Sequence, residues 1–316
     1  VGTGSPGFGE DGLPGNQTKC NSCESGIWAD PDGSVFWGDC SGRLRKYDGI
    51  TGIVTTVFGG TTVHDGESAD RGFLCCPDGI NVGPDGYIYF ADSFNQRIRS
   101  INPMTGIIDT VAGSGVRAYG GDNGPAVDAY IGNPNDVSVD SQGRIVIADT
   151  RHGKVRRVDE DGIIRNVAGG EGLWDRGDTG PAISACLVNV RSVQHDRNDN
   201  IFIGDGIGRI RKIDSLTGII NTVAGIGLAG YTGDGDEATT ARIGTPSAIR
   251  FDNLGNLYFS DSAYHVVRKI DEKGVISTIA GTGEPGFSMD GTLATEARLD
   301  SPFGLAIGLS GEVYIS

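Results

Sequence analysis

Short segments of alternating apolar and polar residues follow one another along the whole chain, and glycine, aspartate or asparagine separates them. Four such segments stand between residues 247 and 281, and they read SAIRFD, LYFSD, VVRKID and GVISTIAG. A period of two, enrichment in Val, Ile and Tyr, and Gly, Asp or Asn at the breaks predict short strands joined by turns. No long stretch has the apolar spacing of 3.6 residues that is typical of a helix. The chain is therefore predicted to be all-β.

The last of these four segments recurs at a nearly constant interval. Its closing glycine is found five times, 54 or 56 residues apart, at Gly59, Gly113, Gly169, Gly225 and Gly281. A fixed period of this length indicates a repeat architecture, and four strands per unit are typical of a β-propeller blade. We expect one domain over residues 1–316, a six-bladed propeller with repeats at about 1–59, 60–113, 114–169, 170–225, 226–281 and 282–316. The last repeat is short, so its two outer strands are expected to be missing from this chain.

Two phrases connect the repeat to a known family. IYFADSFNQRIRSIN at 88–102 and IVIADTRHGKVRRVD at 145–159 resemble NHL repeats, and residues 281–307 resemble the long linkers of secreted NHL proteins. The resemblance covers the whole chain and is weakest in repeat one. It implies a propeller that serves as an interaction or structural module.

Two series of charged residues follow the repeat. In the first, an aspartate ends the second strand and an arginine follows six or seven residues later, which lets the two meet across a loop. Because a binding site is usually made by what differs between blades, we interpret them as structural: each pair, or each aspartate with turn amides, fixes the loop in its blade. The pairs are Asp39/Arg45, Asp92/Arg99, Asp149/Arg156, Asp205/Arg211 and Asp261/Arg268.

The second series consists of aspartates in the linkers, which we interpret as turn-forming residues. One of them begins Asp234-Gly235-Asp236-Glu237, which faintly resembles a calcium loop but lacks the alternating ligands and the distal glutamate of an EF-hand. No cofactor is expected, and calcium is the one weakly indicated ion. The series is Asp11, Asp65, Asp122, Asp178, Asp234 and Asp290.

Five of the six cysteines fall in the first two repeats, which predicts local disulfides. If residues 31 and 32 form a two-residue turn, Cys23 lies opposite Cys40, and opposed residues about 4.5–5.5 Å apart are within disulfide reach. We predict that pair, with Cys20 joined to either Cys75 or Cys76. Cys186 aligns with apolar positions and is expected to be a buried thiol. The alternative is a zinc site at Cys20-x-x-Cys23, for which no second CxxC or histidine pair follows.

Composition and one sequon bear on location. The net charge of −15 disfavours nucleic acid and anionic membranes as partners, and no apolar run is long enough for membrane insertion. Asn16-Gln17-Thr18 is the single N-x-S/T sequon, and it lies in a Gly- and Pro-containing loop. Together with the clustered cysteines it favours an extracellular or cell-surface glycoprotein.

The preferred interpretation is a non-catalytic extracellular interaction or structural module, part of a larger glycoprotein and a candidate subunit of a filament or adhesive assembly. Its expected partners are other proteins or copies of itself, and the open edge of the sixth blade is a template for strand addition.

One alternative is a metal-dependent hydrolase or lyase with its site in the channel, like the gluconolactonase-like enzymes on six-bladed rings. Such a site would use the starts of the first strands, where Asp78, Asn135 and Asp136 can cluster but Arg191 and Phe303 do not suit a cation. No nucleophile and base can be paired by their spacing.

A second alternative is glycan binding by aromatic residues of the linkers, which otherwise pack over their own blades. These residues are Tyr119, Trp174 and Tyr231.

Overall fold

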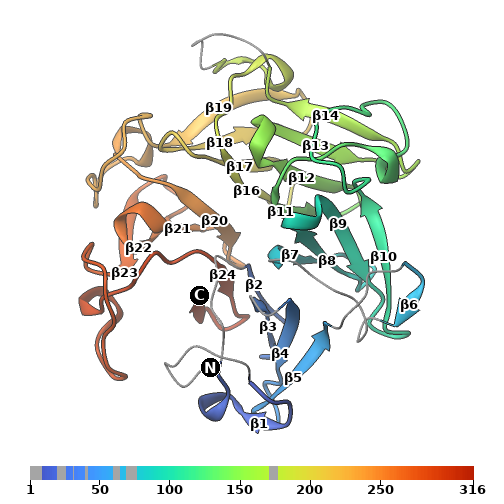
Figure 1. Ribbon diagram of the computed structural model, residues 1–316. Coiled ribbons are helices and arrows are strands. Elements are labelled where there is room, and N and C mark those ends of the chain that lie inside the picture. Colours follow the sequence, from blue (N-terminus) through green and yellow to red (C-terminus); the bar gives the residue numbers. More distant parts are fainter. Residues whose placement is uncertain are drawn as a thin grey trace.

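The computed structural model describes residues 9–19, 26–30, 32–39, 42–59, 65–68, 77–170 and 177–316. Within them, antiparallel sheets are arranged around a central axis as the blades of a β-propeller (Figure 1). Five sheets have four or five strands, and a two-stranded sheet takes the sixth position. The predicted all-β propeller class is confirmed. No helix in the described part of the chain is long and apolar enough to cross a membrane.

Each blade runs from an inner strand at the axis to an outer strand at the rim. Blade 1 contains β2 (Ile27–Ala29), β3 (Val35–Asp39), β4 (Arg43–Tyr47) and β5 (Ile53–Phe58). Blade 2 contains β7 (Pro77–Val82), β8 (Ile88–Asp92), β9 (Arg97–Ile101) and β10 (Ile107–Ala112). Blade 3 contains β11 (Pro134–Val139), β12 (Ile145–Asp149), β13 (Lys154–Val158) and β14 (Ile164–Ala168).

Blade 4 contains β16 (Val190–His195), β17 (Ile201–Asp205), β18 (Arg209–Ile213) and β19 (Ile219–Ala224). Blade 5 contains β20 (Pro246–Phe251), β21 (Leu257–Asp261), β22 (Val266–Ile270) and β23 (Ile276–Ala280), and the sixth sheet consists of β24 (Leu305–Ile307) and β25 (Val313–Ile315). Two-residue strands from the preceding linkers extend three blades at the rim: β1 (Leu13–Pro14), β6 (Glu67–Ser68) and β15 (Gly180–Pro181).

Single 3-10 turns lie in the linkers and between the second and third strands. Those in the linkers are η1 (Gly15–Gln17), η4 (Ala126–Asp128), η6 (Ala182–Ser184), η7 (Ala238–Thr240) and η9 (Ala294–Glu296). Those inside blades are η3 (Ser93–Asn95), η5 (Thr150–His152) and η8 (Ser262–Tyr264). Because the strands are antiparallel, the linkers and the inner-blade turns lie at the same face of the ring, which we call the linker face.

The register of the first hairpin differs from the expected one by one residue. Trp28 pairs with Phe36, whereas a two-residue turn would have placed Val35 opposite it. The backbone N–H of Asp30 donates to Ser34 O at 2.8 Å and that of Gly33 donates to Asp30 O at 3.0 Å, with Gly33 at φ +82°. A three-residue connection with glycine in the left-handed region fits this pattern. The two-residue turn is therefore wrong, and the Cys23–Cys40 pair, which lies outside the described residues, stays a prediction.

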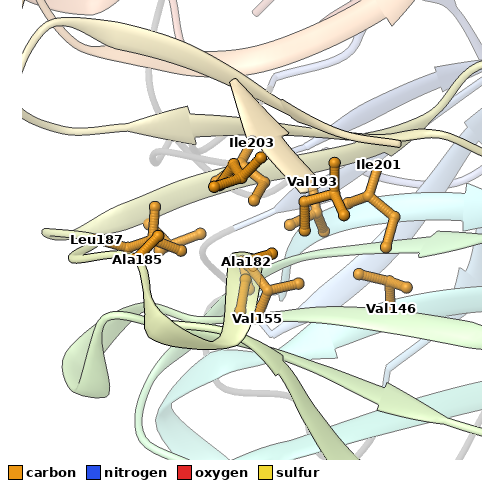
Figure 2. Packing of buried hydrophobic residues seen from close by; sticks show 13 residues of the cluster. Val146, Val155, Ala182, Ala185, Leu187, Val193, Ile201 and Ile203 are labelled. Carbon is orange, nitrogen blue, oxygen red and sulfur yellow. The ribbon is translucent and has the colours of Figure 1, made fainter. Parts of the chain in front are cut away.

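The hydrophobic core lies between neighbouring blades. Figure 2 shows the interface of blades 3 and 4, where Val146 and Val155 face Val193, Ile201 and Ile203, and the linker that follows blade 3 covers one end. Ile203, Val155 and Val193 are fully buried. Each blade thus buries its apolar side chains against the next blade, so the ring is the unit of stability.

The two-stranded sixth sheet closes the ring. Leu305 is fully buried and packs with Tyr258 and Val267 of blade 5. On the other side, Ala306 belongs to a cluster with Trp37 of blade 1. The same sheet therefore contacts both the fifth and the first blade.

Candidate functional site

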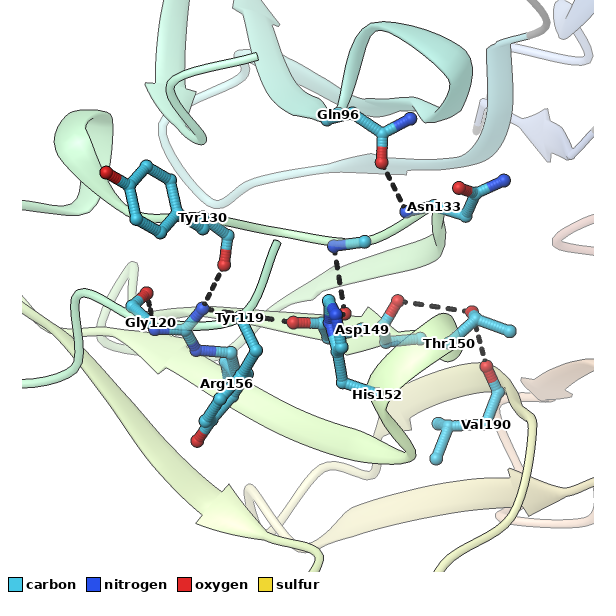
Figure 3. Close-up of polar contacts among 12 residues, drawn as sticks. Gln96, Tyr119, Gly120, Tyr130, Asn133, Asp149, Thr150, His152, Arg156 and Val190 are labelled. Atoms are coloured by element: carbon cyan, nitrogen blue, oxygen red, sulfur yellow. Dashed lines mark hydrogen bonds and ion pairs between the residues drawn. The ribbon is translucent and has the colours of Figure 1, made fainter. Parts of the chain in front are cut away.

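The repeated arginine of the third strand is buried in every complete blade, and it binds an aspartate of the linker. Arg156 is fully buried; its Nη2 lies 2.6 Å and its Nε 3.0 Å from Asp122 Oδ1. Its Nη1 and Nη2 also donate to the carbonyl oxygens of Tyr130 and Gly120, at 2.8 and 3.1 Å (Figure 3). The guanidinium therefore fastens the linker to its blade. The five arginine–linker aspartate distances are 3.3 Å for Arg45–Asp11, 2.8 Å for Arg99–Asp65, 2.6 Å for Arg156–Asp122, 2.7 Å for Arg211–Asp178 and 2.5 Å for Arg268–Asp234.

The aspartate that ends the second strand lies farther from this arginine. The separations are 3.9 Å for Asp92–Arg99, 3.8 Å for Asp149–Arg156 and 4.0 Å for Asp205–Arg211. Asp149 and Asp261 instead accept backbone N–H groups of the linker, from Gly132 at 3.0 Å and from Gly244 at 2.7 Å. Burial raises the pKa of Asp205 to about 6. In blades 2, 3 and 4, the aspartate that ends the second strand and the aspartate of the linker thus both lie near the buried arginine of that blade. The linker aspartates therefore do more than form turns.

Tyr119 and Tyr231 of the linkers cover two of these arginines. The Tyr119 ring centroid lies 5.3 Å from the Arg156 guanidinium carbon, and the Tyr231 centroid lies 5.4 Å from that of Arg268, which are cation–π distances. Tyr119 Oη donates to Asp122 Oδ2 at 2.6 Å, and burial raises the pKa of Tyr119 to about 12. Both rings are engaged by their own blades. Trp174 lies outside the described residues.

Only some residues of the cysteine, calcium and sequon predictions lie in the described part of the chain. Cys20, Cys23, Cys40, Cys75 and Cys76 lie outside the described residues, so their pairing stays a prediction. Cys186 is an unpaired thiol and is half-buried, not buried as its alignment with apolar positions suggested. The carboxylate of Asp234 is held by Arg268 at 2.5 Å. Asn16 is exposed in η1, and Thr18 of its sequon donates from Oγ1 to Pro14 O at 3.2 Å.

The central channel is crossed by one buried pair. Arg250 of β20 donates from Nη2 to Ile80 O of the opposite blade at 3.4 Å, and its Nη1 lies 4.0 Å from Asp136 Oδ2. Asp136 accepts the N–H of Val193 at 3.1 Å and that of Val137 at 2.9 Å. Burial raises the pKa of Asp136 to about 6 and lowers the pKa of Arg250. Asp136, one of the residues that could cluster in a metal site, therefore connects neighbouring blades.

A cavity of about 460 Å³ opens at the linker face, between the starts of β7, β11 and β16. It combines strand starts identified in the sequence, Asp78, Asn135 and Arg191, with residues that the sequence did not indicate. Asp78 Oδ2 accepts the Ser93 hydroxyl at 2.5 Å. The other strand starts, Ser247 and Phe303, do not line it, and Ser25 lies outside the described residues. The lining residues are Asp78, Ser93, Phe94, Arg117, Asn133, Asn135, Thr150, Arg151, Asn189 and Arg191.

The charge of this cavity is opposite to that of the whole chain. Three arginines and one aspartate line it, although the net charge of the chain is −15. Within the described residues, the exposed guanidinium groups of Arg117 and Arg151 have no hydrogen bond or ion pair, and the buried Oδ1 of Asn133 has no hydrogen-bond partner. No group of three His, Cys, Asp or Glu side chains that could hold a metal occurs among the described residues. The cavity therefore offers cations and a hydrogen-bond acceptor to a ligand.

Family models match two parts of the repeat array. The teneurin NHL domain model matches residues 227–287, and the NHL repeat model matches residues 132–157, which span β11, β12 and η5. This propeller contains NHL-type repeats. The likeness inferred from the Ala-Asp and Arg phrases of the sequence is thereby confirmed.

Two curated relatives are much longer than the segment over which they resemble this chain. Teneurin-1 from Mus musculus is 22% identical over 325 residues, which cover 90% of this chain and 12% of that protein. Protein SUPPRESSOR OF QUENCHING 1, chloroplastic, from Arabidopsis thaliana is 29% identical over 155 residues, which cover 45% of this chain and 14% of that protein. The matched segments thus span about an eighth of the length of these relatives.

Solved structures share the fold of the NHL propeller. An auxiliary nutrient binding protein from Bacteroides ovatus superposes with a TM-score of 0.69 at 18% identity, over 96% of this chain and 68% of that chain. A gluconolactonase from Xanthomonas campestris superposes with a TM-score of 0.58 at 14% identity, over 92% of this chain and 82% of that chain. At these identities the likeness establishes the fold alone.

Proposed function

We propose that this NHL propeller is a non-catalytic extracellular interaction module of a larger secreted or cell-surface glycoprotein, and that the linker-face cavity is its recognition site. The observation that supports the proposal most is the pair of unpartnered guanidinium groups in the cavity, Arg117 and Arg151, beside the unpaired amide oxygen of Asn133. A few unused polar groups converging in a concave site are typical of recognition.

The depth of the cavity agrees with binding at the face of the ring. Asp78 and Arg191 stand at the second position of their inner strands, whereas Arg250 stands three residues deeper in β20. Because a strand advances about 3.3 Å per residue, Arg250, which contacts Asp136, lies roughly 10 Å farther from the linker face than the strand positions that line the cavity. A ligand would then meet the cavity from outside and leave the same way.

The extracellular address rests on the sequon and on the cysteine-rich first repeats. Asn16 is exposed in its 3-10 turn, as an acceptor of a glycan must be. Treatment of the secreted protein with peptide N-glycosidase is expected to lower its mass, and Asn16→Gln is expected to abolish that change. An unchanged mass would count against the glycoprotein part of the proposal.

The edge of the sixth sheet is a second element of the proposed interaction. In the described residues β25 pairs with β24 alone, so its outer backbone groups are available to another strand. A strand from elsewhere in the protein or from a partner would pair there by strand addition. Membership of a filament or an adhesive assembly stays a prediction.

Site-specific photo-crosslinking tests the proposal. Phe94 lines the cavity and is 61% exposed, whereas Phe287, a matched control away from the cavity, is 84% exposed. Each phenylalanine is replaced in turn by p-benzoylphenylalanine, and the propeller is irradiated with surface and secreted proteins of its source cells. We expect a protein adduct from position 94 that excess unlabelled propeller competes away. No adduct at 94, or equal adducts at 94 and 287, would contradict the proposal.

A further inference from the structure

We infer that the linker-face cavity binds a carboxylate side chain of a partner protein segment whose flanking residues are apolar. The inference rests on the proposed interaction function and adds the chemistry of the partner.

Two of the three arginines of the cavity come from separate elements, and neither forms an ion pair with a described acid. Arg117 belongs to the linker before η4, and Arg151 belongs to η5. Every described arginine that follows the repeat pattern in the third strand binds a linker aspartate, but these two lie outside that pattern and are exposed. A guanidinium binds a carboxylate with two parallel hydrogen bonds, and charge-assisted bonds of this kind are stronger than neutral ones. The cavity therefore selects an anion.

Amide groups next to the arginines suit a peptide backbone. Asn133 and Asn189 precede β11 and β16 with φ of 47° and 51°, a left-handed conformation that asparagine tolerates. Asn133 Oδ1 is buried without a hydrogen-bond partner, and leaving such an acceptor unpaired is unfavourable. A backbone N–H of a bound segment would satisfy it. Inorganic anions such as phosphate carry no comparable row of donors at neutral pH.

An exposed aromatic side chain lines the cavity, which favours a protein segment over a small anion or an acidic sugar. Phe94 is 61% exposed, and Val116 and Val188, which directly precede the lining residues Arg117 and Asn189 in sequence, are 52% and 43% exposed. Exposed apolar residues near a polar centre are typical of protein interfaces, where aromatic residues contribute most to affinity. The combination of two cations, an unpaired amide and an exposed phenylalanine matches a glutamate or aspartate between apolar neighbours.

Two short peptides test the inference by calorimetry or by chemical-shift titration of the whole chain at low salt. Acetyl-Leu-Glu-Leu-amide is the probe, acetyl-Leu-Gln-Leu-amide is its uncharged match, and sodium glucuronate and inorganic phosphate represent the other sources of an anion. We expect the dissociation constant of the Glu peptide to be at least about tenfold lower than that of the Gln peptide and that of either small anion. The charge-assisted bonds distinguish it from the Gln peptide, and contact with Phe94 distinguishes it from the small anions. Equal affinity for the two peptides would overturn carboxylate recognition.

Variants separate this inference from the proposed function. Arg117→Gln with Arg151→Gln should weaken the Glu peptide about tenfold or more, whereas Lys273→Gln, in the turn between β22 and β23 on the opposite face, should not change it. Phe94→Ser should weaken both peptides, and Phe287→Ser should weaken neither.

Three outcomes would overturn the inference. They are glucuronate or phosphate binding as tightly as the Glu peptide, no binding of any probe, and an Arg117/Arg151 variant that binds like the wild type. If the crosslink from position 94 nevertheless forms with the double arginine variant, the interaction function stands and carboxylate recognition fails. If that crosslink is absent from the wild type while the Glu peptide binds, the carboxylate site stands and the protein partner fails.

Discussion

Asp122→Asn removes the negative charge that faces a fully buried arginine and leaves the shape of the side chain unchanged. In the wild type, Asp122 accepts Arg156 Nη2 at 2.6 Å, Arg156 Nε at 3.0 Å and the Tyr119 hydroxyl at 2.6 Å. The Asp122 side chain is 23% exposed and the Arg156 side chain is fully buried. The variant therefore removes the closer of the two carboxylates beside this buried guanidinium and leaves Asp149, at 3.8 Å, as the other.

The size of the effect follows from what remains around Arg156. Removing one partner of a fully buried ion pair costs about 3–5 kcal/mol. The carbonyl oxygens of Tyr130 and Gly120 still accept the guanidinium, and Asp122 is partly solvated, so the expected loss is about 2 kcal/mol of the free energy of unfolding. The matched control is Asp11→Asn, because Asp11 is 50% exposed and lies 3.3 Å from Arg45. An exposed carboxylate at that distance contributes about 0–1 kcal/mol.

Equilibrium unfolding in urea at pH 7 measures both variants against the wild type. The free energy of unfolding is expected to fall more for Asp122→Asn than for Asp11→Asn, with the slope against urea unchanged. In the double variant Asp122→Asn with Arg156→Met, part of the loss should return, because the guanidinium that lost its closer carboxylate is gone. Equal losses for the two single variants, or no recovery in the double variant, would refute the role of Arg156 in fastening the linker.

Burial lowers the pKa of His195 to about 4 from 6.5, so the unfolded chain binds the extra proton first and the free energy of unfolding falls as the pH drops from 6.5 to 4. Between pH 7.5 and pH 5 this decrease in the free energy of unfolding should amount to about 2 kcal/mol in urea unfolding, and His195→Gln should abolish it. A pH profile like that of the wild type would contradict this. Burial raises the pKa of Asp136 to about 6 from 3.8, so the folded state binds the proton first and Asp136 contributes stability that is lost as the pH rises through 6. In Asp136→Asn the free energy of unfolding should depend less on pH in this range, and a steeper dependence would contradict this role of Asp136. Ile203→Ala opens a cavity at a fully buried site between blades 3 and 4 and should cost about 2–5 kcal/mol in the same assay, whereas a cost below 1 kcal/mol would argue against blade-to-blade packing as the core.

The fold could be predicted because each repeat carries its own local signals. The phrase LYFSD became β21, and Gly86, Gly143 and Gly255 adopt positive φ in the tight turns between the first and second strands of blades 2, 3 and 5. The first hairpin was misjudged by one residue because a three-residue turn with left-handed glycine, here Gly33, reads much like a two-residue turn in sequence. Local chemistry thus determines which strands form, and small differences in turns determine their register.

The site could be predicted only in part because its residues are far apart in sequence. Asp78, Asn135 and Arg191 were identified as starts of inner strands, and those positions meet at the axis in any propeller. Arg117 and Arg151 join them because a linker and a 3-10 turn of blade 3 pack over the same face. In the sequence, both arginines depart from the repeat. That departure alone does not show where their side chains meet.

The partners of Arg156 could be predicted only in part for a similar reason. The sequence suggested Asp149, seven residues away, whereas the closer carboxylate belongs to Asp122 in the preceding linker. Spacing along the chain cannot show that a linker folds back over the blade that follows it. Such contacts are set by tertiary packing.

We infer that recognition lies where the blades differ and that the repeated arginine–aspartate contacts are scaffold. Chemical-shift mapping of the ¹⁵N-labelled chain with acetyl-Leu-Glu-Leu-amide distinguishes the two roles. Perturbed amides are expected to cluster around the linker-face cavity of blades 2–4, including those of Phe94, Arg117 and Arg151, and the corresponding turns of blade 5 are expected to stay unchanged. Perturbations of equal size at corresponding positions in all blades, or confined to the opposite face, would contradict it.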